Sequence, residues 1–373
     1  MKLVQSTFEE FGDYVKKNNT SIIFFGAGAI GKVLIPYICN LHELDNNVLG
    51  YVDNNPSKQG ERVSLCSRQV GIHSINWLET RVDNNTVLVI TNGDFASSIA
   101  QLDRLDCLRD TICFLAPVMQ LMNKGNAGVI THSFNEPVIP KRIHYCWFSG
   151  NPIPEKLQRC IASWKEMCPD YEIIRWDESN YDLSKYRYTQ QAFDSKKWAF
   201  IPDIVRLDVL YEYGGFYFDT DVEIIRNLDD LRYQDAFCGR EEWGHVNFGG
   251  GSGCRKNFEL IKEILVFRKD EPFIREDGSF NTEASGYYET TPLVRRGLHI
   301  ENTTEIIDGM TIYSAEYFSP YNYGSGTENI TENTFSIHYF SGGWLGEEGN
   351  QYRKETRMKY SQIVSSMAPF FTK

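Results

Sequence analysis

Short apolar segments alternate with amphipathic segments along the first third of the chain. The apolar residues between Thr7 and Lys17 recur with helical spacing, and Ser21 to Phe25 is an apolar run ended by glycine. The same alternation continues with a helix-like segment at 30–41, strand-like segments at 47–52, 86–90 and 111–115, and a helix that begins after Asp94. Alternating strands and helices predict a parallel sheet with crossover helices.

The pattern lapses between Asn123 and Pro140, where Gly, Pro and Asn occur without periodicity. It then resumes with strands expected at 141–147, 171–176, 216–218, 235–239, 246–249 and 334–338, and helices at 154–167, 188–213 (interrupted at Pro202) and 256–268. The chain is therefore expected to be an α/β protein. Its parts are a Rossmann-like domain at 1–125, a linker at 126–140 and a second α/β domain at 141–373.

Composition and charge narrow the class of protein. The 373 residues fit two domains of about 150 residues, or slightly more than two. A net charge of −12 argues against sequence-independent nucleic-acid binding, which depends on neutralising phosphates. No apolar run approaches the ~20 residues of a membrane-spanning helix. The N-terminus lacks the apolar core of a signal peptide, so a cytoplasmic location is expected.

The C-terminal segment 352–371 is locally basic and then apolar. It places Arg353, Lys354, Arg357 and Lys359 ahead of Ile363, Val364, Met367, Phe370 and Phe371. Such a helix can lie in an anionic headgroup layer at the inner face of a membrane, or it can pack on the rest of the domain. The sequence leaves both readings open.

A glycine-rich turn follows the first buried strand. Gly26 allows the tight turn, Gly28 lets a pyrophosphate approach the backbone, and Gly31 lets the helix pack on the strand. Asp53, at the end of the next strand, stands where a carboxylate would bond a ribose hydroxyl. These four residues predict a site for a nucleotide ligand, the alternative being that the glycines only let the chain turn. The segment 49–60 resembles the nucleotide-sugar-binding N-terminal domain of bacterial sugar acyltransferases.

Two carboxylates lie between two apolar strand-like segments in the second domain. Asp219 and Asp221 point to the same side of an extended chain, and such a pair is half of a site for a hard divalent cation such as Mn²⁺ or Mg²⁺. Asp203 and Arg206 lie three residues apart on a predicted helix that leads into this turn. We expect these four residues to hold a diphosphate-bearing donor through a metal.

The order of motifs in the second domain resembles glycosyltransferase family 32. The motifs are Ile143-His-Tyr-Cys-Trp147, Cys160-Ile-Ala-Ser-Trp-Lys165, Pro169-Asp-Tyr-Glu-Ile173, Asp203-x-x-Arg206, Gly214-Gly-x-Tyr-x-Asp-x-Asp221, His338 and Trp344. This family includes bacterial capsular-polysaccharide sugar transferases and yeast mannosyltransferases, and it is similar in catalytic core to the large clostridial glucosylating toxins. The resemblance implies a GT-A fold, a nucleotide-sugar donor, a divalent metal and retention of anomeric configuration.

The resemblance also implies individual roles. It implies that Trp147 stacks on uracil and that Asp203 and Arg206 bind the sugar. It also implies that Asp219 binds the sugar or the ribose and that Asp221 binds the metal. His338 would complete the metal site, and Trp344 would close over the diphosphate. Tyr217 belongs to the donor-binding set, and so does Asn247 if it is not simply a turn residue. Thr290-Thr291-Pro292 departs from the Thr-Gly-Pro of much of the family, which affects the acceptor side.

The predicted function is therefore transfer of a hexose or N-acetylhexosamine from a nucleoside-diphosphate sugar, with UDP favoured, to a lipid-linked surface polysaccharide. Three alternatives remain. Tyr181 and Lys185 have the Tyr-x-x-x-Lys spacing of short-chain dehydrogenases, which would make the chain a sugar-nucleotide oxidoreductase or epimerase. The others are a non-catalytic nucleotide-sugar sensor or scaffold and a protein-glucosylating effector similar to the toxins. If the chain is a glycosyltransferase, the glycine loop of the first domain would hold a second nucleotide.

Overall fold

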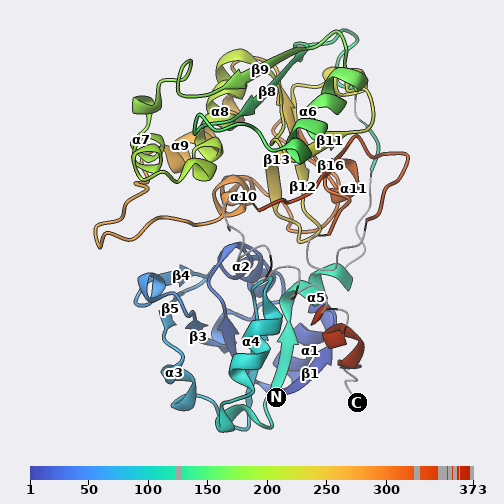
Figure 1. Ribbon diagram of the computed structural model, residues 1–373. Helices are drawn as coiled ribbons and strands as arrows, with labels where there is room; N and C mark the ends of the chain where they lie inside the picture. The colour runs from blue at the N-terminus through green and yellow to red at the C-terminus, as the bar shows by residue number, and fades with distance from the viewer. Residues whose placement is uncertain are drawn as a thin grey trace. The chain divides into compact units, whose positions relative to one another are not determined.

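The chain forms two compact units, described here from a computed structural model. The structure describes residues 1–122, 128–130, 132–322, 328–342, 351, 355, 359–360 and 362–369. Unit 1 comprises Met1–Lys124 with Gln351–Lys373, and unit 2 comprises Gly125–Asn350. Each unit has its own sheet (Figure 1). The mixed α/β architecture expected from the sequence is confirmed.

Unit 1 is built on an eight-stranded sheet in the order β17-β1-β7-β6-β2-β3-β5-β4. Neighbouring strands are parallel except β4 and β5. The strands are β1 (Lys2–Gln5), β2 (Ser21–Phe25), β3 (Val48–Val52), β4 (Arg62–Ser64), β5 (Gln69–His73), β6 (Thr86–Ile90), β7 (Ile112–Leu115) and β17 (Ala368–Pro369). The run β5-β3-β2-β6-β7 has the strand order of a doubly wound parallel sheet, and this order reverses between β2 and β6.

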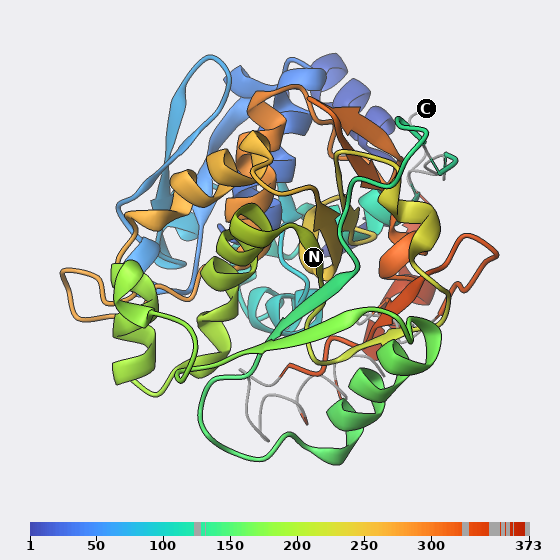
Figure 2. The same cartoon turned by 90° about the horizontal axis from the view of Figure 1, so that it is seen from above.

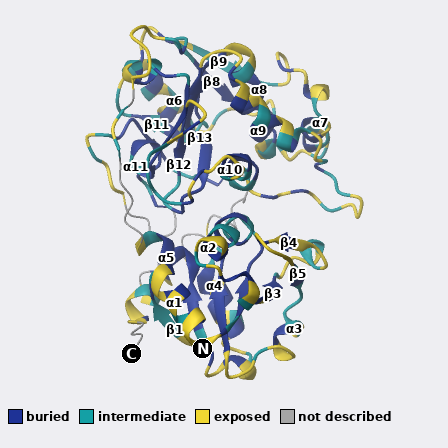
Figure 3. Cartoon of the chain, turned by 180° about the vertical axis from the view of Figure 1, so that it is seen from behind, coloured by how far each residue is buried: buried dark blue, intermediate teal, exposed yellow. Residues whose placement is uncertain are grey.

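Helical segments connect these strands. The α-helices are α1 (Phe8–Asn18), α2 (Ile35–Leu41), α3 (Asn76–Glu79), α4 (Phe95–Leu102) and α5 (Ala116–Met122). A capping box between Thr7 and Glu10 starts α1, and the Asp94 side chain caps α4. The helix expected at 30–41 begins as a π-helical segment, η1 (Ile30–Leu34). Figure 3 shows the central strands buried and the outer helix faces exposed.

The C-terminal segment differs from the sequence prediction, which assigned 141–373 to one domain. Strand β17 pairs in parallel with β1, and Met367 is buried in the core of unit 1. Tyr360 packs against Phe95 with ring centroids 5.2 Å apart. The segment therefore belongs to unit 1, because a two-residue strand added to a sheet edge leaves no pattern in the sequence. Arg353, Lys354, Arg357, Phe370 and Phe371 lie outside the described residues.

Unit 2 is built on a mixed seven-stranded sheet in the order β14-β15-β12-β13-β10-β8-β9, and a small sheet pairs β11 with β16. The strands are β8 (Arg142–Cys146), β9 (Glu172–Trp176), β10 (Gly215–Tyr217), β11 (Val222–Ile224), β12 (Ala236–Arg240), β13 (Val246–Cys254), β14 (Glu305–Ile307), β15 (Met310–Tyr313) and β16 (Ser336–His338). The helices are α6 (Glu155–Met167), α7 (Arg187–Asp194), α8 (Pro202–Tyr213), α9 (Glu259–Lys269), α10 (Ser285–Arg295) and α11 (Ala315–Phe318). Figure 2 shows the paired strands β8 and β9 in green, side by side.

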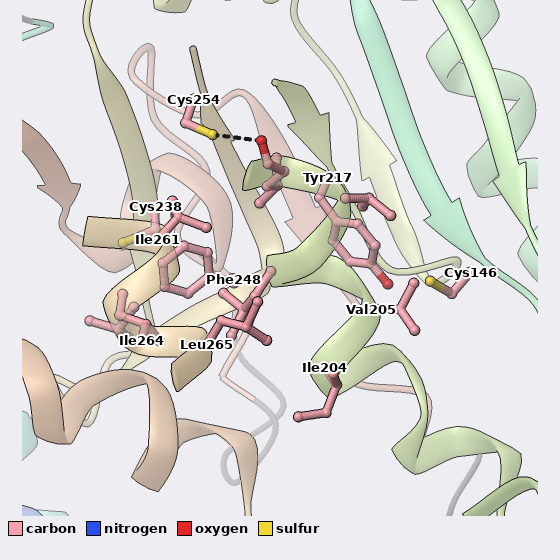
Figure 4. Packing of buried hydrophobic residues seen from close by; sticks show 14 of the residues in the cluster. Cys146, Ile204, Val205, Tyr217, Cys238, Phe248, Cys254, Ile261, Ile264 and Leu265 are labelled. Atoms are coloured by element: carbon pink, nitrogen blue, oxygen red, sulfur yellow. Dashed lines mark hydrogen bonds between the residues drawn. The ribbon is translucent and has the colours of Figure 1, made fainter. Parts of the chain in front are cut away.

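Strand alternation in β10 divides the core of unit 2 into two clusters. Tyr217 points into one cluster with Phe248 of β13, Val205 of α8 and Ile261 of α9 (Figure 4). Phe216 points into the other, which also contains Trp164 of α6. Because side chains alternate along a strand, β10 is buried on both faces and its end is held firmly. The Asp219–Asp221 turn follows directly from this strand.

Part of the expected linker also belongs to unit 2. The backbone N–H groups of Val138 and Ile139 donate to the Arg232 carbonyl at 2.9 and 3.2 Å. Ile139 is fully buried in the core of unit 2. Val138 and Ile139 thus anchor this Pro- and Gly-rich stretch to unit 2. The second unit therefore begins before residue 140, where the prediction ended the linker.

Candidate active site

The acidic turn in unit 2 is positioned by two glycines and a central strand. Helix α8 ends at Gly214, and Gly214 and Gly215 have φ values of 65° and 102°, which non-glycine residues rarely adopt. A Cβ atom on Gly215 would lie 2.8 Å from the Arg142 carbonyl oxygen. Strand β10 can therefore pair closely with β8 and deliver Asp219 to the end of the sheet. There the Asp219 N–H donates to the Gly249 carbonyl at 2.8 Å.

Asp219, Asp221 and His338 converge into one cluster. Each offers a ligand atom, and these atoms lie within 4.8 Å of one another. The antiparallel pairing of β11 with β16 places Val222 opposite His338, which brings together residues more than a hundred positions apart. The His338 Nε2 atom is 3.3 Å from Asp221 Oδ1. The predicted metal ligands are thus brought together, although their roles remain untested predictions.

Asp221 and His338 of the cluster form an ion pair. Burial opposes ionisation of both Asp221 and His338, yet their mutual attraction holds the pKa of Asp221 below its usual value and raises the pKa of His338. The Ser341 backbone N–H also donates to Asp221 Oδ2 at 2.7 Å. Two carboxylates and one imidazole form a donor set that suits Mn²⁺, which accepts oxygen and imidazole ligands. The residues present therefore fit the divalent metal that the sequence implied.

Arg206 lies at the centre of a buried network of charges. Its guanidinium group is 3.2 Å from Asp203 Oδ1, 3.3 Å from Asp219 Oδ2 and 3.2 Å from Glu289 Oε1. Burial opposes its charge, but the three carboxylates raise its pKa well above the usual value. Arg206 is thus a permanent cation fixed beside the candidate metal ligands.

Strand β13 approaches this network through glycines. A Cβ atom on Gly249 would lie 2.1 Å from Asp219 Oδ2 and 3.1 Å from Arg206 Nη1. A Cβ atom on Gly250 would lie 3.2 Å from His338 Nδ1. The Val-Asn-Phe-Gly-Gly sequence therefore allows the backbone to pass directly behind the acid and imidazole side chains.

Asn247 connects the cluster to the end of β12. Its amide nitrogen donates to Glu241 Oε1 at 2.9 Å and lies 3.4 Å from His338 Nδ1. Its amide oxygen accepts from the Gly250 N–H at 3.0 Å. The turn interpretation of Asn247 does not describe it, because the residue lies within β13. Its expected contact with donor hydroxyls remains a prediction.

The structure bears differently on the other residues predicted to bind the donor, which are Tyr217, Trp147 and Trp344. Tyr217 is fully buried, and its hydroxyl donates to Asp219 Oδ1 at 3.1 Å. It therefore orients Asp219 instead of offering a surface to the donor, which corrects the prediction. Trp147 is half-buried at the end of β8 and donates from its indole nitrogen to the Asn151 carbonyl at 2.7 Å. Trp344 lies outside the described residues.

Sequence reasoning missed Glu289 and Arg268. Arg268 of α9 is 3.1 Å from Asp203 Oδ2, and Glu289 of α10 accepts from the Phe248 N–H at 3.0 Å. Helix α10 was not predicted because Pro292 lies within it. The only available signal was a Glu beside the Thr290-Thr291-Pro292 motif, in a segment that reads as polar.

The glycine loop of unit 1 has the expected backbone constraints. Gly26 has a φ of 115°, and a Cβ atom on Gly31 would lie 2.2 Å from the Gly26 carbonyl oxygen. A Cβ atom on Gly28 would meet no atom within 4 Å, so the space beside it is open. Asp53 faces the loop, where its Oδ2 atom accepts from the Ala27 N–H at 2.7 Å. Nucleotide binding at these residues remains a prediction.

The Tyr-x-x-x-Lys spacing has a structural explanation. The Tyr181 hydroxyl donates to Asp208 Oδ2 at 2.8 Å, and Lys185 Nζ lies 2.7 Å from Asp208 Oδ1. Lys185 thus neutralises the buried Asp208 carboxylate on α8, and Tyr181 donates a hydrogen bond to it. They also lie in unit 2, whereas the glycine loop is in unit 1. These contacts remove the reason for the oxidoreductase alternative.

Comparison with known proteins points to sugar transfer. Residues 154–238 match the family described as "Glycosyltransferase sugar-binding region containing DXD motif". Inositol phosphoceramide mannosyltransferase 3 of Schizosaccharomyces pombe is 33% identical over 147 residues, covering 38% of this chain and 37% of the relative. Mannosyl phosphorylinositol ceramide synthase CSH1 of Saccharomyces cerevisiae is 31% identical over 144 residues, covering 36% and 37%.

These findings support a glycosyltransferase enzyme, as the sequence predicted. The chain spans little more than a third of the length of these curated relatives. Among solved structures, the PaToxG glycosyltransferase is 21% identical with a TM-score of 0.29, covering 35% of this chain and 60% of that one. This score is too low to support a statement about fold or function. Membership in family 32 and a capsular acceptor stay predictions.

Proposed function

We propose that unit 2 transfers a hexose from a nucleoside-diphosphate sugar to an acceptor hydroxyl, with a divalent metal held by Asp219, Asp221 and His338. The convergence of these three side chains beside a buried arginine carries the proposal. The matched DXD region and the mannosyltransferase relatives support it. Mn²⁺ fits the donor set best, and Mg²⁺ is the second choice.

The chemistry follows from where charge develops. As the bond between the anomeric carbon and the diphosphate oxygen breaks, its electron pair leaves with the diphosphate. A metal at the cluster supplies positive charge to that leaving group. Arg206 is held by Asp203, Asp219 and Glu289, so it adds a preorganised cation without reorganising during the reaction. The acceptor oxygen bonds the anomeric carbon, and its proton passes to the departing phosphate oxygen.

Retention of configuration is part of the proposal. The carboxylates around Arg206 are each engaged with it, and Asp221 is engaged with His338. We therefore propose front-face transfer without a covalent glycosyl-enzyme. Mass spectrometry that traps a sugar on an Asp or Glu side chain would contradict this step.

The identity of the sugar and the acceptor is a finer proposal. The names of the relatives favour mannose as the sugar and an inositol-bearing lipid as the acceptor. The sequence resemblance favours UDP-sugars and a lipid-linked polysaccharide. Among the described residues, no helix is both long and apolar enough to cross a membrane. The cytoplasmic location and peripheral membrane contact remain predictions.

A screen of donors tests the proposal directly. The full chain is incubated with UDP-hexoses, UDP-N-acetylhexosamines and GDP-mannose, with Mn²⁺ or with EDTA, and the release of free nucleoside diphosphate is measured. We expect hydrolysis of at least one donor with Mn²⁺ and none with EDTA. Failure to bind or hydrolyse any donor in the presence of Mn²⁺ would leave the scaffold alternative as the better description.

A further inference from the structure

Arg268 is a buried cation on helix α9, which packs against both α8 and α10. Its guanidinium group lies over two tyrosine rings, with its central carbon 4.6 Å from the ring centroid of Tyr188 on α7 and 4.4 Å from that of Tyr288 on α10. The Nη2 atom also donates to the Tyr188 hydroxyl at 2.7 Å. Contacts from two other helices therefore hold the guanidinium group in one place.

The Arg268 side chain is paired with Asp203, with Nη2 3.1 Å from Asp203 Oδ2. Burial opposes the charge of Arg268, but the attraction of Asp203 raises its pKa above the usual value. The Nε and Nη1 atoms have no hydrogen-bond partner among the residues that the structure describes. Burying such groups costs free energy, and a well-packed apolar side chain avoids that cost. Stability alone therefore does not account for an arginine at this position.

Asp203 is bound by two arginines through different oxygens. Its Oδ1 atom is 3.2 Å from Arg206 Nη2, and its Oδ2 atom is 3.1 Å from Arg268 Nη2. Turning the carboxylate out of its present plane lengthens at least one of these contacts. Each carboxylate oxygen can accept two hydrogen bonds, so both oxygens can still accept one from a ligand. Arg268 thus fixes the orientation of Asp203 without using up its acceptor positions.

Asp203 also lies close to the candidate metal cluster. The Arg206 Nη2 atom that contacts Asp203 is 3.3 Å from Asp219 Oδ2, so one nitrogen joins the two carboxylates. The sugar of a nucleotide-sugar is attached directly to its diphosphate, and its hydroxyls donate hydrogen bonds to carboxylates. The Asp203 side chain is 11% exposed, whereas that of Arg268 is 1% exposed. A ligand at the cluster therefore touches Asp203 and not Arg268.

We propose that Arg268 is a positioning residue for sugar transfer, because it fixes the Asp203 carboxylate that accepts hydroxyl hydrogen bonds from the donor's sugar. The inference rests on the proposed function, and it adds a residue that no sequence motif indicates. It divides the donor site into two parts. The metal cluster binds the diphosphate, and the Asp203–Arg268 pair recognises the sugar.

This division is tested by comparing nucleotide-sugars with their own nucleoside diphosphates on the full chain. The probes are UDP-glucose with UDP and GDP-mannose with GDP, each with Mn²⁺. Arg268→Met replaces the cation by an apolar side chain of similar length. We expect kcat/KM for probe hydrolysis to fall at least tenfold, while calorimetry shows nucleoside diphosphate affinity within twofold of the wild type. Arg268→Lys keeps the charge but lacks the planar donor fork, and its kcat/KM should fall at least threefold. It provides the same comparison if Arg268→Met does not fold.

A double-mutant cycle tests whether Arg268 acts through Asp203. Asp203→Asn alone should lower hydrolysis at least tenfold, and adding Arg268→Met to it should lower hydrolysis by no more than a further twofold. Arg295→Met is the matched control, since Arg295 is an exposed arginine of α10 that lies over the Phe267 ring. It should leave hydrolysis and nucleotide affinity unchanged.

Three results would overturn the inference in a chain that circular dichroism shows to be folded. They are unchanged hydrolysis in the Arg268 variants, an equal loss of hydrolysis and nucleoside diphosphate affinity, and full additivity with Asp203→Asn. A wild type that neither binds nor hydrolyses any probe would instead contradict the proposed function, and this inference with it.

Discussion

Arg206 and Glu289 form a buried ion pair that joins helices α8 and α10, with Arg206 Nη1 3.2 Å from Glu289 Oε1. The other carboxylate oxygen of Glu289 accepts the Phe248 N–H, one residue before the glycine that contacts Asp219. Glu289 thus holds both the arginine and the strand behind the acidic turn. We regard it as a positioning residue, since it acts on the site through Arg206.

The first prediction concerns the pH dependence of stability. Burial raises the pKa of Glu289 from 4.5 to about 7, although Arg206 opposes the shift. Between these values the folded protein keeps a proton that the unfolded chain has lost, so stability falls as pH rises through this window. The shift corresponds to at most about 3 kcal/mol. In Glu289→Gln this contribution should disappear, and the free energy of unfolding should vary less between pH 4.5 and 7.

Denaturant unfolding of unit 2, followed by tryptophan fluorescence, measures this difference. Glu263→Gln is the matched control, because Glu263 of α9 forms an exposed pair with Arg296, the residue that follows α10. It should leave the pH profile of the wild type unchanged. Parallel pH profiles for Glu289→Gln and the wild type would show that Glu289 is ionised throughout the window.

The second prediction tests the metal assignment. Asp221→Asn removes one full charge from the cluster and the ion-pair partner of His338. We expect loss of Mn²⁺-dependent nucleotide binding in a thermal-shift assay and loss of at least nine-tenths of turnover. Asp230→Asn, which breaks an exposed pair with Arg226, serves as the control. Turnover above a tenth of the wild-type value in Asp221→Asn would refute the assignment of this residue as a metal ligand.

The sequence allowed prediction of those parts of the site that depend on local patterns. The glycine pair, the Asp219–Asp221 turn and the Asp203–Arg206 spacing lie within twenty residues of one another, and local alternation was enough to place them. His338 was assigned through the resemblance, but its placement depends on the pairing of β11 with β16. Glu289 and Arg268 could not be found, because their roles arise only from the packing of α9 and α10 against α8.

The predicted fold class is confirmed, but several elements were not predicted, for similar reasons. The strands of the first parallel sheet are apolar runs, which made them visible in the sequence. The antiparallel pair β4–β5 is short and largely polar, and β17 contributes only two residues to a sheet edge. Such elements form because a neighbouring strand offers free hydrogen-bonding groups, and that information lies elsewhere in the chain.

The third prediction uses the close approach of β13 to Asp219. Gly249→Ala places a Cβ atom 2.1 Å from Asp219 Oδ2, so the carboxylate must move away from its present position. We expect metal-dependent nucleotide affinity to fall at least tenfold while circular dichroism shows a folded chain. Gly286→Ala is the control, since its Cβ atom would lie 3.7 Å from His245, an ordinary contact. Equal nucleotide affinities for the two variants would show that Asp219 is not constrained by β13.

The last prediction separates the two units by their ligands. The cluster of unit 2 offers metal ligands, whereas the glycine loop of unit 1 offers backbone N–H groups and a helical segment, for which no metal is needed. If the loop holds a nucleotide, the full chain should bind two nucleotides per molecule with Mn²⁺ and one nucleotide with EDTA.

Gly28 has open space at its Cβ position, so Gly28→Trp should fold normally and fill the space beside the glycine loop. Equilibrium dialysis with radiolabelled nucleotide should then show that this variant loses the EDTA-resistant site and keeps the Mn²⁺-dependent one. Asn84→Trp, at an exposed position in unit 1 without a positive φ, controls for the bulk of the side chain. A stoichiometry of one with Mn²⁺ and zero with EDTA in the wild type would mean that the glycines only shape the turn.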